Sequence, residues 1–322
     1  MKPLLRGALA GVLLVLTAVA CTSPSPSPTP MPTPTPPPPP TIAIFPVGQA
    51  LSALAFDGES LWVANRGDNT ITILRKDGAV RAITTAGRAP SALAYGGGFV
   101  WAANEEDGTV TKLTLSGQQV RTVPVGKRPV ALAYTSDALW VANYDDGTVW
   151  RLSRDGAVTG RVQVGRLPRA LVASSQWLWV ANQGDGTVAQ VDLNSLAVRT
   201  FPAISGPSPG IVAGNDRGVV AMTWDGASVW LAFPKANAVT RVGEDGAMLG
   251  YVGVAGGPAA LLALEDAVWV GDGQGESITR LTREGKVVGS YALGGAPAAL
   301  VSDGTDLWVA LANRDAVARV SP

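Results

Sequence analysis

The chain has 322 residues, of which 47% are hydrophobic and 38 are glycine. This is enough apolar sequence for a large core, and the glycine content indicates many turns between short strands. The formal net charge is zero and the chain has no histidine. It therefore lacks the basic excess of a general nucleic-acid-binding protein, and we expect no nucleic-acid partner.

Residues 1–20 have the pattern of a secretory signal peptide. Lys2 and Arg6 precede an apolar run at 8–20, which is short for a membrane span. The run ends in Ala-Val-Ala directly before Cys21, the only cysteine of the chain, which therefore cannot form an internal disulfide. This arrangement resembles a bacterial lipobox and predicts lipidation of Cys21. The protein would then be extracytoplasmic and anchored to the cell membrane. The alternative is an ordinary signal peptide with an incidental cysteine.

Residues 21–40 follow as a Pro/Ser/Thr-rich segment that cannot form a core. Proline-rich chain favours extended polyproline II geometry, so the segment spans on the order of 60 Å at about 3.1 Å per residue. We interpret it as a tether between the lipidated Cys21 and a folded domain at 41–322.

The folded domain is an internal repeat marked by one tryptophan per unit. Five of the six gaps between these tryptophans are 39 residues, and the fourth is 51. The residues are Trp62, Trp101, Trp140, Trp179, Trp230, Trp269 and Trp308. A fixed period of this size indicates an array of supersecondary units. The fixed register within an apolar run favours a place in the core between units, rather than on a ligand platform.

Each unit contains four apolar runs separated by turn signals. In the second unit a Gly-x-x-Pro link ends at Pro90, followed by apolar runs at 91–95 and 99–103. An Asp-Gly turn at 107–108 leads to a third run at 110–113, and another tight turn leads to a fourth. Four short antiparallel strands in about 40 residues are typical of a β-propeller blade.

The two ends of the repeat complement each other. The last unit stops after its third strand, and the segment Thr41–Gly48 has the pattern of a fourth strand. We expect it to pair with the last blade and close an all-β, seven-bladed propeller, which removes exposed sheet edges. We expect this propeller to be a monomer.

Two features depart from the repeat. An insertion at residues 205–216 lies between the fourth strand of the fourth unit and the first strand of the fifth, and it is either functional or a tolerated loop. Trp150, Trp177 and Trp224 are out of register with the repeated tryptophans. They either contact a partner or fill gaps between blades.

The pattern Pro…Leu-Trp-Val-Ala-Asn…Asp-Gly-Thr-Val resembles the YVTN-type bacterial β-propeller repeat over 41–322 and is also similar to streptogramin B lyase-like and NHL-type propellers. The resemblance to YVTN-type proteins implies an extracytoplasmic binding or surface protein. The lyase family relies on histidine acting with acidic residues and a metal, so its catalytic assignment does not carry over to a chain without histidine.

The strands expected to line the central channel contain no Asp, Glu, His or Cys. They are 52–55, 91–94, 130–133, 169–172, 220–223, 259–262 and 298–301. Hydrolases need a positioned base or nucleophile, and calcium or magnesium sites need several oxygen ligands. We therefore predict no catalytic residues, metal site or cofactor there. Carboxylates gather instead in the turns between second and third strands, where turn stabilisation is the simplest explanation and cation binding at the turn of the second or third blade is the alternative. These residues are Asp68, Glu105, Glu106, Asp107, Asp145, Asp146 and Asp185.

Five basic residues lie in the links that enter the second, third and fourth blades. They are Arg88, Lys127, Arg128, Arg166 and Arg169, and we call them the basic arc. The links entering the sixth and seventh blades are uncharged. Clustered Arg and Lys favour carboxylate or phosphate ligands, so the basic arc is the candidate ligand-binding site. The alternative is that these residues pair with the neighbouring turn acids.

These observations favour a membrane-anchored, non-catalytic lipoprotein that acts as a ligand-binding or protein-interaction scaffold. Its expected partner on the ring face is an anionic small molecule, a glycan or an acidic protein. The alternative is a lyase or hydrolase of the streptogramin B lyase-like class that uses loop carboxylates and a metal.

Overall fold

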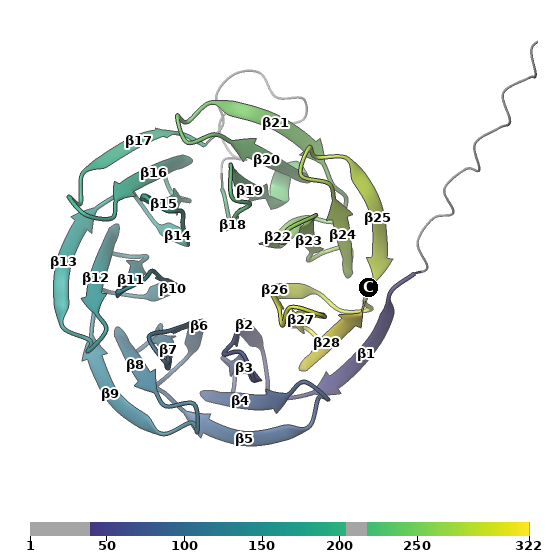
Figure 1. Cartoon of the computed structure of the whole chain (residues 1–322), viewed down its shortest axis with the longest axis horizontal. Coiled ribbons are helices and arrows are strands. Elements are labelled where there is room, and N and C mark those ends of the chain that lie inside the picture. Colours follow the sequence, from purple (N-terminus) through teal and green to yellow (C-terminus); the bar gives the residue numbers. More distant parts are fainter. Residues whose placement is uncertain (1–38, 204–217, 322) are drawn as a thin grey trace, which may run out of the picture. The chain divides into compact units, whose positions relative to one another are not determined.

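The computed structural model describes residues 39–203 and 218–321, which form seven four-stranded antiparallel sheets arranged in a ring (Figure 1). The predicted seven-bladed β-propeller is confirmed. The predicted signal peptide, Cys21, most of the tether and the insertion at 205–216 lie outside the described residues.

Each blade runs from an inner strand at the channel to an outer strand at the rim (Figure 1). The strands of blades 1 to 4 are β2 (Leu51–Phe56), β3 (Ser60–Asn65), β4 (Thr70–Arg75), β5 (Val80–Thr85), β6 (Pro90–Gly96), β7 (Phe99–Asn104), β8 (Thr109–Leu113), β9 (Gln119–Pro124), β10 (Pro129–Tyr134), β11 (Ala138–Asn143), β12 (Thr148–Ser153), β13 (Val158–Gln163), β14 (Pro168–Ala173), β15 (Trp177–Asn182), β16 (Thr187–Asp192) and β17 (Val198–Pro202).

Blades 5 and 6 follow the same order, and blade 7 takes its outer strand from the N-terminal end of the domain. The strands are β18 (Ala221–Trp224), β19 (Val229–Phe233), β20 (Ala238–Val242), β21 (Met248–Gly253), β22 (Pro258–Ala263), β23 (Val268–Asp272), β24 (Ser277–Leu281), β25 (Val287–Ala292), β26 (Pro297–Ser302), β27 (Leu307–Leu311), β28 (Ala316–Ser321) and β1 (Thr41–Pro46). One 3-10 turn, η1 (Pro234–Ala236), follows β19.

The ring is closed by hydrogen bonds between its two ends. β1 pairs antiparallel with β28, with Thr41 opposite Ser321 and Pro46 opposite Ala316. Beyond the strand, the backbone N–H of Val47 donates to the carbonyl of Asp315 at 2.9 Å. The predicted closure is therefore confirmed, and β28 has no open edge.

The second strand of each blade carries the core of the ring. Every residue of β3 and of β11 is buried, which explains why these runs do not alternate apolar and polar residues. None of the seven repeated tryptophans is more than 4% exposed. Trp62 of blade 1 shares a cluster of buried side chains with Leu93 and Val100 of blade 2. The repeated tryptophans therefore lie between blades, as the sequence predicts.

A basic side chain on the third strand covers the tryptophan in five blades. The distances from the cation to the ring centroid are 5.2 Å for Lys112 and Trp101, 5.6 Å for Arg151 and Trp140, and 5.8 Å for Arg241 and Trp230, Arg280 and Trp269, and Arg319 and Trp308. Lys112 also donates to the carbonyl of Arg154 in blade 3 at 2.8 Å, and its burial lowers its pKa. These cations thus add cation–π contacts, and some add hydrogen bonds to the next blade.

An aspartate before the second strand anchors the indole in three blades. The Oδ2 atom of Asp57 accepts a hydrogen bond from Trp62 Nε1 at 2.8 Å, and its Oδ1 atom accepts from the backbone N–H of Glu59 and Ser60. Asp225 and Asp303 hold Trp230 and Trp308 in the same way, at 2.6 and 3.0 Å. A buried indole N–H usually has a hydrogen-bond partner, and in these three blades the turn supplies it without interrupting the core.

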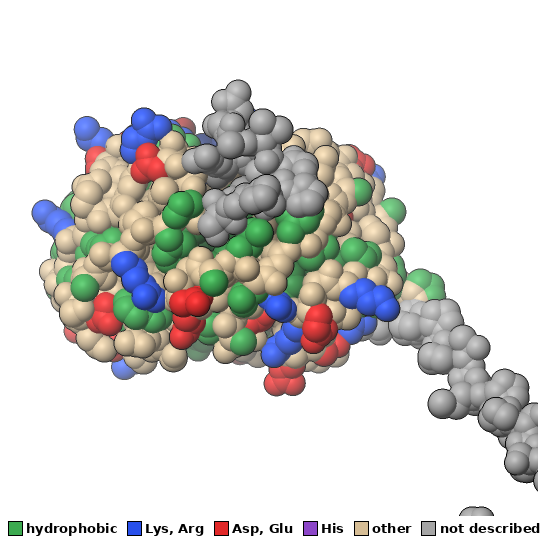
Figure 2. Space-filling model, turned by 90° about the horizontal axis from the view of Figure 1, so that it is seen from above, with side chains coloured by type: hydrophobic (Ala, Val, Ile, Leu, Met, Phe, Trp, Pro, Cys, Tyr) green, Lys and Arg blue, Asp and Glu red, His purple; other side chains and the backbone are tan. Residues whose placement is uncertain are grey.

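The outer strands are largely exposed, as in β5 and β9. Ile83 on β5 is the most exposed large hydrophobic residue among them, at 64%. Figure 2 views the ring from its side and shows scattered hydrophobic side chains on the wall, with charges of both signs interspersed. The described part of the chain contains no helix with the length and hydrophobicity needed to cross a bilayer.

The three out-of-register tryptophans pack against the core between blades. Trp150 and Trp177 are half-buried, and Arg161 and Arg199 lie over their rings at 4.0 and 4.7 Å. Trp224 stacks on Trp179 with ring centroids 6.3 Å apart. Trp224 and Trp177 therefore pack against the cluster between blades 4 and 5, and Trp150 packs against the cluster between blades 2 and 3.

Deleting residues 41–48 tests the closure. Loss of β1 exposes the edge of β28 and removes the cover of Phe45 over Trp308, whose ring centroids are 5.8 Å apart. We expect the truncated domain to lose cooperative unfolding or to aggregate, measured by circular dichroism melting and light scattering. A matched deletion of residues 24–31 of the tether should leave the transition unchanged. A normal melting transition after deletion of 41–48 would contradict the closure role.

One buried position distinguishes blade 6 from its neighbours. Three residues after the tryptophan, blades 1 to 4 have Asn65, Asn104, Asn143 and Asn182, whereas blade 6 has Asp272. Asn104 Nδ2 donates to the hydroxyls of Thr109 and Thr111, both at 2.9 Å. Asp272 is 1% exposed, and its Oδ2 atom accepts from Ser277 at 3.0 Å and Thr279 at 2.7 Å. Burial raises the pKa of Asp272 although these hydroxyls oppose the shift.

Asp272→Asn is therefore expected to stabilise the domain at neutral pH. An acid whose pKa is raised by folding binds its proton more tightly in the folded state, so its contribution to stability falls as pH rises above its unfolded value. The amide removes this cost and restores the geometry of blades 1 to 4. We expect a gain on the order of 1 kcal/mol at pH 7, or about 2–4 °C in Tm, which shrinks toward pH 4.

The reverse substitution, Asn104→Asp in blade 2, is the matched control and should lower Tm at pH 7 more than at pH 4. Thermal melts of both variants and the parent protein across this pH range measure the effect. A destabilised or pH-independent Asp272→Asn variant would show that the charge of Asp272 carries no such cost.

Candidate functional site

In each of blades 1 to 4, the link that precedes the first strand is hydrogen-bonded to the turn between the second and third strands of that blade. The Oδ2 atom of Asp107 accepts a hydrogen bond from the backbone N–H of Arg88 at 2.7 Å. The equivalent bonds join Asp68 to Gln49 at 2.7 Å, Asp146 to Lys127 at 2.6 Å and Asp185 to Arg166 at 2.6 Å. The link also packs closely on the blade, since a Cβ at Gly87 would lie 2.6 Å from Asn104 Cγ. These four acids hold the face on which the basic arc lies.

The structure distributes the basic arc among three adjoining depressions. Arg88, Lys127 and Arg128 line a groove of about 720 Å³. Arg166 lines a second depression of about 390 Å³, and Arg169 lines the central channel. The predicted residues therefore share one face of the ring without forming one pocket.

Three of the five basic-arc residues are paired with turn acids, namely Arg88, Arg128 and Arg166. Arg88 Nε lies 2.6 Å from Asp107 Oδ1, and Arg166 Nε lies 2.9 Å from Asp185 Oδ1. The backbone and guanidinium hydrogen bonds of Arg88 hold the pKa of Asp107 below its usual value. In contrast, the side chains of Lys127 and Arg169 have no ion-pair partner within 39–203 and 218–321.

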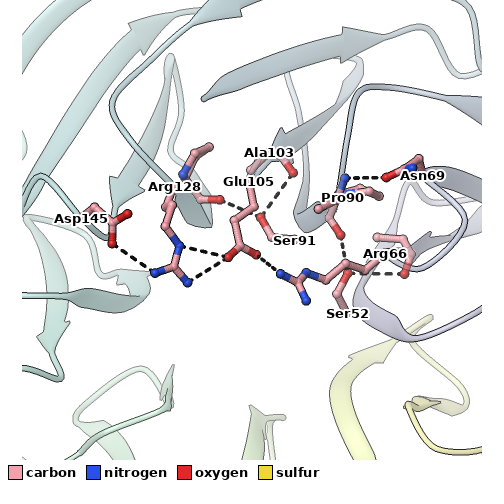
Figure 3. Close-up of polar contacts among 12 residues, drawn as sticks. Ser52, Arg66, Asn69, Pro90, Ser91, Ala103, Glu105, Arg128 and Asp145 are labelled. Atoms are coloured by element: carbon pink, nitrogen blue, oxygen red, sulfur yellow. Dashed lines mark hydrogen bonds and ion pairs between the residues drawn. The ribbon is translucent and has the colours of Figure 1, made fainter. Parts of the chain in front are cut away.

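Arg128 belongs to a chain of ion pairs at the mouth of the channel, drawn in Figure 3. Glu105 lies between two guanidinium groups, with its Oε2 atom 2.9 Å from Arg66 Nη2 and its Oε1 atom 3.0 Å from Arg128 Nη2. Arg128 Nη1 also contacts Asp145 Oδ1 at 3.1 Å. The Glu105 side chain is 10% exposed, whereas both arginine side chains are 47% exposed. The hydrogen bond to Glu105 raises the pKa of Arg128.

The chain of polar contacts continues around the ring. The Arg128 guanidinium lies over the Tyr144 ring at 4.8 Å, and the Tyr144 hydroxyl donates to Gln183 Oε1 at 3.0 Å. Arg66, Glu105, Tyr144 and Gln183 occupy one equivalent position, four residues after the tryptophan, in blades 1 to 4. The same position holds Pro234, Gly273 and Ala312 in blades 5 to 7. The mouth is therefore polar on one side and apolar on the other.

The channel forms a cavity of about 780 Å³ lined by the first strands of all seven blades. The charged residues that line it are Arg66, Glu105, Arg128 and Arg169. The first strands contribute no carboxylate, but one carboxylate reaches the channel from a turn. Glu105 comes from the turn after β7, which overhangs the mouth and brings its carboxylate to the cavity.

Arg66, Tyr144 and Gln183 were not among the residues predicted for the site, and Glu105 was assigned to turn stabilisation. Their signal in the sequence is a comparison of equivalent positions rather than a motif. Four residues after each tryptophan, the side chain changes from polar in blades 1 to 4 to small or apolar afterwards. The repeated tryptophan is buried in all seven blades, so core packing does not explain why this neighbouring position changes from polar to small or apolar.

The arrangement offers fixed positive charge beside a cavity rather than a set of metal ligands. Among the described residues, no three His, Cys, Asp or Glu side chains are grouped as a metal site. Arginine guanidinium groups present several donors in a fixed plane and bind carboxylates or phosphates. The chemistry of the mouth is thus suited to recognition of an anion.

No family model and no curated protein sequence matches the chain. Its structure is similar to virginiamycin B lyase from Staphylococcus aureus, with a TM-score of 0.77 and 15% identity over 88% of this chain and 99% of that one. The WD40 repeats of RRP9 give a TM-score of 0.76 at 14% identity, over 87% and 97% of the two chains. BamB from Moraxella catarrhalis gives 0.60 at 17% identity, over 85% and 84%. These identities establish the propeller fold alone.

Proposed function

We propose that this protein is a non-catalytic binding or scaffolding protein whose ligand docks on the ring face at the basic arc and the channel mouth. The observation that carries the proposal is the pair of half-exposed guanidinium groups, Arg66 and Arg128, held on either side of the buried carboxylate of Glu105 beside an open cavity. Glu105 and the turns fix these groups before any ligand arrives. Preorganised donors of this kind lower the cost of binding.

The charge of the mouth supports an anionic partner. The residues lining the channel carry three arginines and one glutamate, whereas the adjoining groove is lined by equal numbers of basic and acidic residues. The expected ligands are an anionic small molecule, a glycan with acidic groups or an acidic protein surface.

The alternative activity is a lyase or hydrolase that uses loop carboxylates and a metal. The fold likeness to virginiamycin B lyase favours it. Its candidate residues are Glu106 and Asp146 on the same face. Turnover that requires a divalent metal and disappears in Glu106→Gln or Asp146→Asn would establish this activity instead of simple binding.

We further propose that the protein is extracytoplasmic and held to the cell membrane by a lipid on Cys21. This rests on the N-terminal sequence, in which an apolar run precedes a single cysteine and a proline-rich tether. The tether would hold the ring at a distance from the membrane and leave its face accessible.

Changing all five arc residues, Arg88, Lys127, Arg128, Arg166 and Arg169, to Ser should weaken binding of anionic probes such as poly-glutamate and heparin. We expect the difference from wild type to shrink as salt rises, because exposed charges are screened over about 8 Å at physiological ionic strength. Surface turn substitutions usually change stability by about 0.5 kcal/mol, so the fold should survive. Affinity is measured by biolayer interferometry at several salt concentrations.

The matched control removes the same charge from the outer strands and hairpins. Its five substitutions to Ser are at Arg75, Arg81, Arg121, Arg161 and Lys286. Equal weakening in both variants would mean that only net charge matters, and full affinity in the arc variant would place the site elsewhere.

Cys21→Ser tests the anchor. We expect the variant to lose lipid and its membrane association, because the thiol is the acylated group in a lipobox. Metabolic labelling with an alkyne fatty acid and membrane fractionation measure both properties, and Thr22→Ser is the matched control. Labelling and membrane association equal to wild type in Cys21→Ser would refute the lipobox interpretation.

A further inference from the structure

The channel cavity is divided into a charged half and an apolar half. All charged residues that line it come from blades 1 to 4, namely Arg66, Glu105, Arg128 and Arg169. Every described lining residue from blades 5 to 7 is apolar, including Met222, Leu261 and Leu300. A cavity built for structural reasons alone in a repeat protein would show the same lining all round.

The division recurs at a second equivalent position. Arg169 is the first residue after the link proline in blade 4, and Ala259 and Ala298 occupy that position in blades 6 and 7. All three line the cavity. The exposed Arg169 side chain has no ion-pair partner among the described residues. Each of these two register positions thus supplies one cation from blades 1 to 4 and only small or apolar residues from blades 5 to 7, although Val130 holds the second position in blade 3.

The size of the cavity fits a small molecule. Its volume of about 780 Å³ lies within the range of roughly 300–1,000 Å³ of typical ligand sites. The inner-strand serines that line the cavity are already engaged, since the hydroxyls of Ser52 and Ser91 donate to the carbonyls of Pro90 and Pro129 at 2.6 and 2.7 Å. The arginines are therefore the groups that select for the charge of a ligand. The alanine and leucine side chains provide the surface for its apolar part.

We infer that the channel mouth binds a small amphipathic organic acid. Its carboxylate would meet Arg66 and Arg169, and its apolar body would lie against blades 5 to 7. This inference rests on the proposed binding function and names its ligand class. A strongly hydrophilic anion would leave the apolar wall in contact with water, and a neutral lipid would leave the arginine charge without a partner.

Glu105 has a defined part in this site. Glu105 and Asp145 together balance the charges of Arg66 and Arg128 and hold both groups in place, so the surplus positive charge of the mouth comes from Arg169. The ligand carboxylate would use Arg169 and the guanidinium nitrogens of Arg66 that do not contact Glu105, because the nitrogens of Arg128 are all bound to Glu105 or Asp145. Glu105 also repels an incoming anion at close range, so its removal should tighten binding provided that the arginines keep their places.

The experiment titrates the folded domain with butanoate, hexanoate and octanoate by isothermal calorimetry, with octanol and octylammonium as neutral and cationic analogues. We expect affinity to rise about fourfold per methylene added, and octanoate to bind at least tenfold more tightly than either analogue. Arg66→Met and Arg169→Met should each weaken octanoate binding about tenfold, and Glu105→Gln should strengthen it several-fold.

Wall variants test the apolar half separately. Ala259→Phe and Ala298→Phe fill the cavity from blades 6 and 7 and should flatten the chain-length dependence. Arg166→Met, whose residue pairs with Asp185 outside the cavity, is the matched control and should bind octanoate as wild type does. Arg66→Met breaks the ion pair with Glu105, whereas Arg169→Met breaks no ion pair. Weaker octanoate binding in Arg169→Met therefore reports the loss of a ligand contact rather than the loss of local structure.

Equal affinity for butanoate and octanoate, or for octanoate and octylammonium, would overturn the inference. So would octanoate binding that is insensitive to both arginine changes. If octanoate does not bind while poly-glutamate binds in an arc-dependent way, the ligand class is wrong and the proposed function stands. Failure of wild type to bind any of the acids or polyanions would overturn the proposed function as well.

Discussion

The ring depends on the burial of one tryptophan per blade between that blade and the next. Each indole lies on a strand that is apolar on both faces, so a blade cannot bury its second strand alone. Replacing such a large buried side chain by alanine typically costs about 3–5 kcal/mol. The aspartate that accepts the indole N–H in three blades and the cation that covers the ring in five blades reinforce this contact. Closure by β1 follows from the same requirement, because blade 7 would otherwise leave Trp308 without the cover of Phe45.

This constraint applies to strands and leaves much of the turns free to vary. The links of blades 1 to 4 have the same Gly-x-x-Pro or related geometry and the same aspartate bond to the backbone. The side chains on that framework differ from blade to blade. Arg66, Glu105, Tyr144 and Gln183 form a connected polar chain at a position where the last three blades have Pro, Gly and Ala. The asymmetry of the mouth is therefore a property of side chains placed on a symmetric backbone.

The fold was predictable because its signal is repeated. The tryptophan spacing, the Asp-Gly turns and the missing final strand all indicated seven blades and closure by Thr41–Gly48. The face shared by the basic links and acidic turns was predictable too, from the order of strands in a blade. The ion pairs at the mouth of the channel could not be predicted. Arg66 is a single arginine after a strand, and only the ring geometry brings it to the opposite side of Glu105 from Arg128, 62 residues along the chain. Contacts between blades depend on how far each turn overhangs the channel, which no local pattern encodes.

The backbone conformation of Arg128 is a requirement of the fold and not of the binding site. Arg128 has a φ of 53°, in the left-handed region that non-glycine residues seldom adopt. Such a conformation at a binding residue invites an explanation by function. However, Ala50, Ala89 and Leu167 have φ values of 50°, 50° and 52° at the equivalent position of the other links. The conformation is therefore required by the link itself, which must bring its N–H to the turn aspartate and pack its glycine against the blade. The links of blades 1 to 4 all have this strained backbone conformation. At Arg128 the same conformation also directs the guanidinium group toward Glu105 and the channel.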